Sequence, residues 1–477
     1  MNDVNVPLKL NIKRTMLIGF AFFGILLLWQ VYDSWCPTFL TELFKGAFPG
    51  RTEEEVQYLV GVMMAIDNLA ALILLPIFGR ISDKTRTKIG KRMPFILVGT
   101  FVCSIAFPFI PVLFHLNSLA GVICMMAIVV VFAMMYRNPA VALMPDITPK
   151  PLRSKANGII NIMGYIGGAF ATVVGIFFVL SDYLGTALNK DGTPKAHTWA
   201  FNNIWAIEAP FLIASVLMLI SAIVLFFTVR ENELEAKMKE EMERGEEMAE
   251  VVDKVTEDGP MSKANKRMLI FILIAEVFWF MADNGIGTFM GNYAIYFLKT
   301  SSSSNMINTI VGGVGSVVGF AIGGTIASKI GRKWSIFGGL TLTALSYVVW
   351  AILTFVVGGL AGSGKFPVWI YAIWFIKGFG MSLVHVNSFP MVVELCPNSK
   401  IGAFTGYYYA ASMAAQTVTP IALGSLLLID GFSWEFLPVY ALVCVIASLV
   451  IFLFVINVKS VKTNFKSGLE AIGDAED

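Results

Sequence analysis

Apolar segments recur along the whole chain and are separated by short polar loops. Each is about 20 residues long, which is the length of helix that crosses the roughly 30 Å hydrocarbon core of a bilayer. In lipid each segment must be a helix, because a helix satisfies its own backbone hydrogen bonds. The pattern therefore predicts twelve membrane spans, at residues 16–36, 58–79, 94–114, 118–145, 157–181, 204–228, 267–298, 306–328, 334–357, 367–393, 402–428 and 436–457.

One long polar stretch interrupts this pattern and divides the spans into six and six. It predicts an N-terminal half at residues 1–229, a linker at 230–266 and a C-terminal half at 267–477. The linker alternates Glu with Lys and Arg, which is typical of a solvated helix with intrahelical ion pairs. We therefore expect an all-α polytopic membrane protein with two six-helix halves.

The two halves match each other at an offset of about 250 residues, as in an internal repeat. Trp29 and Asp33 of the first span correspond to Trp279 and Asp283 of the seventh. Further matches join Arg137 with His385, Asp146 with Glu394, and residues 79–92 with residues 324–333. Six helices is an even number, so both halves enter the membrane from the same side. The sequence thus predicts parallel repeats around an axis along the membrane normal, as in carriers whose halves rock about a central site.

Composition and charge agree with a membrane protein. Only 14% of the 477 residues are charged and 56% are hydrophobic, whereas soluble domains carry about 25% charged residues. If both termini are cytoplasmic, most of the 35 Lys and Arg residues lie on that side, as the positive-inside rule requires. The absence of an Asn-x-Ser/Thr sequon favours a bacterial inner membrane. The five cysteines have no spacing typical of a metal site or a disulfide framework.

The loop from Gly79 to Arg92 and its second copy from Gly324 to Lys333 resemble the signature of the major facilitator superfamily. Residues 76–97 and 142–147 resemble, more narrowly, the glycoside–pentoside–hexuronide:cation symporters and the sucrose–proton symporters. The chain departs from the sucrose type at Met93, where a basic residue is usual, and at Val141, where an Arg is usual. The resemblance implies secondary active transport of a sugar.

The resemblance also bears on the coupling ion. Sodium-coupled melibiose carriers have two carboxylates on their second helix, which align with Ala71 and Leu75 of this chain. Neither position is acidic here, so we expect protons as the coupling ion.

Charged residues inside the spans are the first functional candidates, because a charge in hydrocarbon is costly and usually faces water or a partner. The resemblance implies that spans 1, 4, 7 and 10 line the central cavity. Glu276 and Lys377 are further candidates, and all these charges could alternatively form fixed ion pairs that lock helices together. The residues predicted to couple protons are Asp33, Asp67, Arg137, Asp283 and His385.

Sugar hydroxyls need amides and carboxylates, and the apolar face of a sugar ring needs an aromatic side chain. The alternative for each Trp is anchoring at the lipid interface or core packing. The predicted substrate-binding residues are Trp29, Gln30, Asn68, Asn138, Trp279, Asn284, Asn387 and Gln416.

A gate is expected on the cytoplasmic side. The resemblance implies that Asp146 and Glu394, at the ends of spans 4 and 10, bridge to basic loop residues when that side is closed. An alternative role for Asp146 is the proton site itself. The predicted gate residues are Asp83, Arg92, Asp146, Arg153, Arg332, Lys333 and Glu394.

The sequence therefore predicts a sugar:proton symporter that works by alternating access, as a monomer in lipid, with a small molecule and protons as its partners. No cofactor, metal or nucleic acid is expected. One alternative is a drug or metabolite exporter of the same fold. A membrane-embedded transferase is the other, but no nucleophile–base pair or metal-ligand spacing supports an enzyme.

Overall fold

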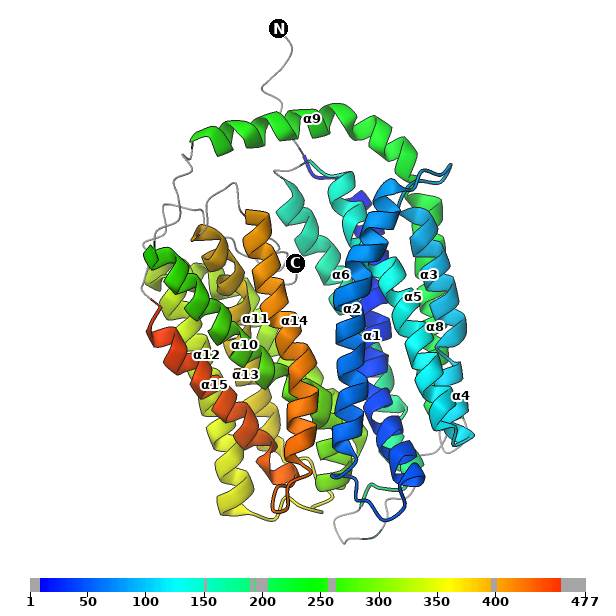
Figure 1. Cartoon of the computed structure of the whole chain (residues 1–477), viewed down its shortest axis with the longest axis vertical. Helices are drawn as coiled ribbons and strands as arrows, with labels where there is room; N and C mark the ends of the chain where they lie inside the picture. Colours follow the sequence, from blue (N-terminus) through cyan, green and yellow to red (C-terminus); the bar gives the residue numbers. More distant parts are fainter. Residues whose placement is uncertain are drawn as a thin grey trace.

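A computed structural model describes residues 9–149, 152–188, 193, 205–255, 263–395 and 401–455. The regular elements of these described residues are helices, arranged in two bundles (Figure 1). The helices of the first bundle are α1 (Ile12–Ala47), α2 (Gln57–Lys84), α3 (Met93–Ala106), α4 (Phe109–His115), α5 (Leu119–Asp146), α6 (Arg153–Phe177), α7 (Leu180–Leu184) and α8 (Trp205–Thr228).

The linker forms one long helix, α9 (Glu231–Val255). The helices of the second bundle are α10 (Lys263–Asn292), the π-helical turn η2 (Tyr293–Phe297), α11 (Ser302–Ile330), α12 (Arg332–Ile352), the π-helical turn η3 (Leu353–Val357), α13 (Val368–Glu394), α14 (Ile401–Leu426), the 3₁₀ turn η5 (Trp434–Phe436) and α15 (Leu437–Leu453).

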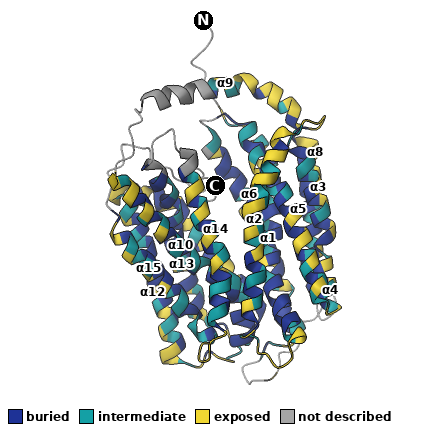
Figure 2. Cartoon of the chain, viewed as in Figure 1, coloured by how far each residue is buried: buried dark blue, intermediate teal, exposed yellow. Residues whose placement is uncertain are grey.

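Eleven helical segments among the described residues are long and apolar enough to cross a membrane, which confirms the predicted spans except one. The remaining span, predicted at 402–428, is α14. It is a helix of 26 residues that contains several Ser, Thr, Gln and Tyr residues and is not among these eleven segments. Large apolar side chains such as Phe227, Val356 and Val368 are exposed on the outside of the bundles (Figure 2). Such a surface suits contact with lipid, whereas in water it would drive aggregation.

The same helix pairs pack together in both halves. In the first half α1 packs on α6 and α8, and α5 packs on α2 and α3. The equivalent helices of the second half repeat this pattern, with α10 on α14 and α15, and α13 on α11 and α12. The predicted internal repeat is therefore visible as repeated packing.

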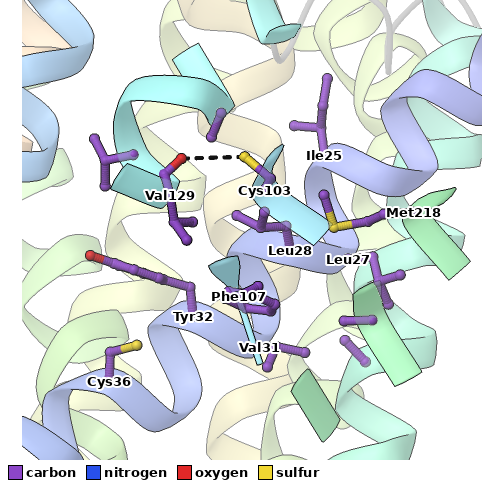
Figure 3. Packing of buried hydrophobic residues seen from close by; sticks show 14 of the residues in the cluster. Ile25, Leu27, Leu28, Val31, Tyr32, Cys36, Cys103, Phe107, Val129 and Met218 are labelled. Atoms are coloured by element: carbon purple, nitrogen blue, oxygen red, sulfur yellow. Dashed lines mark hydrogen bonds between the residues drawn. The ribbon is translucent and has the colours of Figure 1, made fainter. Parts of the chain in front are cut away.

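Each half has its own hydrophobic core. The first core is formed by residues from Ile18 to Val229, joined by a few side chains from η2 and α11, and the second by residues from Met268 to Val455. Figure 3 shows part of the first core, where the Cys103 thiol donates to the Val129 carbonyl oxygen at 3.4 Å. Since van der Waals packing and hydrogen bonds hold helices together in lipid, each half forms a packed unit of its own.

The two ends of the molecule differ. Helix α9 lies across one end, which we call the linker end, and the opposite end is called the distal end (Figure 1). The two bundles lie close together at the distal end and diverge toward the linker end. Across the halves, α2 packs on α14, α6 on α11, and α1 on α10.

The crossing of α2 and α14 brings backbone against backbone. A Cβ atom on Gly61 of α2 would lie 2.1 Å from the carbonyl oxygen of Pro420 in α14. A Cβ atom on Gly424 of α14 would lie 2.5 Å from the carbonyl oxygen of Gln57 in α2. Both distances are far below van der Waals contact, so this crossing requires glycine on both helices.

A buried polar network joins α1, α2 and α10 near the distal end. The Thr38 hydroxyl donates to Asn292 Oδ1 at 2.8 Å, and Asn292 Nδ2 donates to Thr41 Oγ1 at 3.1 Å and to Gln57 Oε1 at 3.0 Å. These four side chains are at most 1% exposed. Asn292 uses both its amide donors and its acceptor, and such a satisfied network inside a low-dielectric interface is strong.

Further polar contacts surround this network. The Tyr296 hydroxyl donates to Glu42 Oε1 at 2.7 Å, and Lys299 Nζ lies 3.5 Å from Glu53 Oε1. Ser181 and Ser302 exchange hydrogen bonds, with each hydroxyl accepting from the other residue's backbone N–H. The distal end is therefore closed by hydrogen bonds as well as by apolar packing.

We expect Asn292→Ala to open the distal end. The change leaves buried hydroxyl and amide groups without a partner, which costs about 1–3 kcal/mol per group. Spin labels at the exposed residues Arg51 and Lys365, on opposite halves, should then show a larger population of long distances. Asn284→Ala is the matched control, because the Asn284 amide donates only to the Phe280 carbonyl of its own helix. An unchanged distance distribution in Asn292→Ala would show that the network does not hold this end closed.

Candidate functional site

Three titratable side chains gather between α10 and α13 in the second half. Lys377 Nζ forms an ion pair with Asp283 Oδ1. His385, two turns along α13, lies close enough to Asp283 and Lys377 for electrostatic interaction. The Asp283 side chain is 33% exposed and the Lys377 side chain 15%, so the pair is accessible although it lies in the middle of two spans. The structure thus brings together Asp283, His385 and the further candidate Lys377.

The first half carries a second acidic group between α1 and α2. The Tyr32 hydroxyl donates to Asp67 Oδ2 at 2.5 Å. Asp33 is exposed, and it lies close enough to Asp67 for their charges to interact. Gln30 Nε2, one turn before, donates to Ser34 Oγ at 3.2 Å. Asp33 and Asp283 therefore occupy equivalent, accessible places on the first helix of each half.

The predicted substrate residues are spread over different surroundings. Trp279 and Asn387 are 0% exposed, so in this conformation neither presents its polar group to a ligand. Asn138 of α5 donates to the Leu75 carbonyl oxygen of α2 at 2.5 Å, which holds two helices together. Trp29 is half-buried and packs edge-on against Tyr32, with ring centroids 5.5 Å apart.

Two more predicted residues meet where α2 crosses α14. Asn68 Nδ2 donates to the Gln416 backbone carbonyl at 3.2 Å, and Gln416 Nε2 donates to Ser412 Oγ at 3.1 Å. Asn284 is half-buried next to Asp283. Arg137 is half-buried on α5. The roles predicted for these residues, and for those of the preceding paragraph, stay predictions.

Charges at the linker end are concentrated on Arg92. Its Nε lies 2.8 Å from Asp146 Oδ2, its Nη2 2.5 Å from Asp83 Oδ1, and its Nη1 donates to Ser82 Oγ at 2.5 Å. Burial of the guanidinium opposes its charge, but the hydrogen bonds and charges of Asp146 and Asp83 outweigh burial and raise the pKa of Arg92. Lys91 Nζ adds a second cation 3.2 Å from Asp146. The structure therefore brings the predicted Asp83, Arg92 and Asp146 into one cluster.

The other predicted gate residues have different partners here. Arg153 donates to the backbone carbonyls of Thr148 and Pro145 at 3.1 and 3.0 Å. Arg332 Nη1 donates to Asn387 Oδ1 at 3.4 Å, and Lys333 lies over the Trp334 ring. The side chain of Glu394 lies outside the described residues.

Several residues of these clusters were not predicted. Tyr32 lies in a largely apolar stretch with no sequence signal that distinguishes it, and Ser82 belongs to the loop motif but was given no role. Lys377, a single cation in the middle of an apolar span, was a further candidate. The distal network around Asn292 has none, since its members come from three helices and consist of neutral polar residues that are common at helix ends.

Comparisons with known proteins agree with this architecture. A family model described as MFS/sugar transport protein matches residues 17–395. The chain is 22% identical over 344 residues to a lactose permease of Lactobacillus helveticus, covering 69% of this chain and 49% of that protein. It is 28% identical over 176 residues to a lactose permease of Leuconostoc lactis, covering 35% and 27%. The chain thus spans about half or less of the length of these curated relatives.

Solved structures show the same fold. An inward-open structure of the E. coli xylose transporter XylE superposes with a TM-score of 0.63 at 16% identity, over 97% of this chain and 99% of that one. A point mutant of the nucleoside transporter NupG gives a TM-score of 0.62 at 12% identity, over 92% and 99%. With the repeated six-helix halves and a family model that covers most of the chain, these comparisons show that the chain is a multi-pass membrane transport protein of the MFS/sugar transport protein family.

Proposed function

We propose that this protein is a sugar:proton symporter that works by alternating access. Residues 1–229 and 267–477 are its two moving bodies, joined by the linker 230–266. Both termini and the linker end face the cytoplasm of a cell whose inner membrane holds the protein. A monomer suffices, because one chain supplies both halves of the site.

One observation carries the proposal: Asp33 and Asp283 lie at equivalent, accessible places on α1 and α10. Each has a protonatable or cationic neighbour, Asp67 with Tyr32 in one half and Lys377 with His385 in the other. Halves that rock about this level would expose the two acids alternately to each side. The family's description as sugar transporters favours this reading over a drug exporter.

The balance of charge within the spans supports proton coupling. The acids Asp33, Asp67, Glu276 and Asp283 outnumber the permanent cations Arg137 and Lys377. Glu276 is 0% exposed, and neither of its carboxylate oxygens has a hydrogen-bond partner among the described residues. Because an uncompensated carboxylate is costly in this setting, protons are the simplest means of neutralising the excess.

The substrate class follows from the side chains near the two acids. Carboxylates, amides such as Gln30 and Asn284, and the aromatic face of Trp29 offer the chemistry that sugar hydroxyls and ring faces need. Lactose is the first sugar to test, since the curated relatives are lactose permeases. Uptake of a panel of radiolabelled glycosides into proteoliposomes, with an imposed pH gradient, tests the proposal. Uptake of none of them would refute it.

We expect Asp33→Asn and Asp283→Asn to abolish concentrative uptake while the protein still accumulates in the membrane. Asn keeps the shape of Asp but can neither release a proton nor carry a negative charge. Gradient-driven uptake and sugar counterflow should be measured together in both variants. Ser34→Ala is the control on α1, since Ser34 contributes no charge. If both variants concentrate sugar like the wild type, neither acid couples transport.

We expect protons rather than sodium to drive uptake. Uptake should rise as the outer pH falls from about 8 to 6, because the driving proton concentration increases and a buried carboxyl can titrate in that range. Replacing sodium with choline should change nothing, and a protonophore should abolish accumulation. Uptake that collapses in choline but survives the protonophore would point to a sodium site instead.

The Arg92 cluster is the proposed cytoplasmic gate. Asp146→Lys replaces an attraction to Arg92 and Lys91 within the N-terminal half with repulsion, and we expect it to disturb the cytoplasmic surface of that half and slow transport. Adding Arg92→Asp to this variant should restore part of the rate by reversing the pair. Counterflow rates of the single and double variants provide the measurement. A double variant no faster than Asp146→Lys would mean that this pair does not control the gate.

A further inference from the structure

An acid from the linker lies buried against the gate loop. Glu231 is the first residue of α9, and it is only 1% exposed although it belongs to the most polar segment of the chain. Both of its carboxylate oxygens accept hydrogen bonds from backbone N–H groups. Oε1 accepts from the backbone N–H groups of Lys91 and Arg92 at 3.0 and 3.1 Å, and Oε2 accepts from those of Arg92 and Met93 at 3.0 Å each.

These N–H groups are the unpaired donors at the start of α3. An α-helix leaves its first N–H groups without intrahelical partners, and an N-cap side chain normally satisfies some of them. The N-cap residue of α3 is Arg92, whose side chain has no acceptor and forms no capping bond. Glu231 supplies the missing acceptor from another segment, and its negative charge suits the positive end of the helix dipole.

The loop is shaped to receive this carboxylate. Gly90 has a φ of +123°, and a Cβ atom on it would lie 2.0 Å from Glu231 Oε2. A side chain at this position would therefore displace the acid. The next residue of α9 adds to the attachment, because Asn232 Nδ2 donates to the carbonyl oxygens of Thr87 and Lys88 at 3.1 and 3.0 Å.

Arg92 is thus fixed at both its backbone and its side chain. Its backbone is held by Glu231, and its side chain reaches Ser82, Asp83 and Asp146. The direction of a side chain depends on the position of its own backbone, so a fixed turn keeps the guanidinium aimed at both carboxylates. The second copy differs, since α12 begins after Gly331 without a side-chain cap, and Arg332 meets the neutral amide of Asn387.

We propose that Glu231 is a positioning residue for the cytoplasmic gate: it fixes the turn that aims Arg92 at Asp83 and Asp146, and it ties the linker helix to the N-terminal half. These contacts lie within the N-terminal half and the linker, so without this acid the turn loosens and that half loses the fixed cytoplasmic surface on which the closed form of the gate depends. The linker therefore takes part in gating at its first residue. The inference rests on the proposed gate, but its test needs no substrate.

The test compares the cytoplasmic distance between the halves. Spin labels replace the exposed Lys84 at the end of α2 and the exposed Lys329 near the end of α11, in a cysteine-free chain. Glu231→Gln removes the charge and one acceptor. We expect it to raise the ratio of open to closed linker ends on the order of tenfold, the scale set by hydrogen bonds to a charged group. Glu233→Gln is the matched control, since the Glu233 side chain is 54% exposed and, among the described residues, pairs with Arg230 one turn away.

A second variant and a second background keep the test decisive. Gly90→Ala retains Glu231 but places a methyl group in its position, and it should shift the ratio in the same direction. In an Arg92→Ala background, Glu231→Gln should add less than about twofold, because residues that act through one another are not additive. An equal shift with and without Arg92 would reduce Glu231 to a general stabiliser, and no shift in either variant would overturn the proposal. Either result leaves sugar uptake by the wild type, and hence the proposed function, untouched.

Discussion

An ionised side chain within the hydrocarbon of a membrane is costly unless it meets water or a counter-charge, and this constraint determines where the chain can carry chemistry. Most of each half is an apolar core in which no charge takes part. The exceptions are concentrated on the inward-facing helices, where Asp283 has Lys377 and Asp67 has the Tyr32 hydroxyl. Asp33 is exposed and lies near Asp67. Glu276 is the exception, because it is fully buried and has no hydrogen-bond partner among the described residues.

Much of the fold could be predicted from the sequence, because helix length and hydrophobicity follow directly from the thickness of a bilayer. The repeat could also be predicted from the sequence, because Asp33 and Asp283 each follow a Trp of the same helix at the same spacing. A charged residue inside an apolar span can also be recognised from the sequence alone. The direction in which an amide side chain points cannot, and Asn138 points into a contact between two helices. Contacts between distant segments, such as those of Asn292 and Glu231, were beyond sequence analysis, because the residue types are common and tertiary packing sets their partners.

The two copies of the repeat also differ in their charged residues. The N-terminal copy of the loop motif presents Arg92 to two carboxylates, whereas Ser328 stands where the C-terminal copy would match Asp83. In the middle of the spans the cation on α5 is Arg137, and its counterpart on α13 is the titratable His385. The helices of the two halves pack in the same way, but the charged residues at these positions differ. The two halves therefore respond differently to protonation.

The glycine crossing of α2 and α14 has a mechanical consequence. With Gly61 against Pro420 and Gly424 against Gln57, no side chain separates the two backbones at the crossing. Gly61 lies near the distal start of α2, which leaves roughly 35 Å of helix between it and Lys84 at 1.5 Å per residue. A rotation of about 10° at this fulcrum moves the far end of such an arm by about 6 Å. In the proposed alternating-access cycle the short arm would seal one side while the long arm opens the other, so a small angular change would be enough to admit a molecule the size of a sugar.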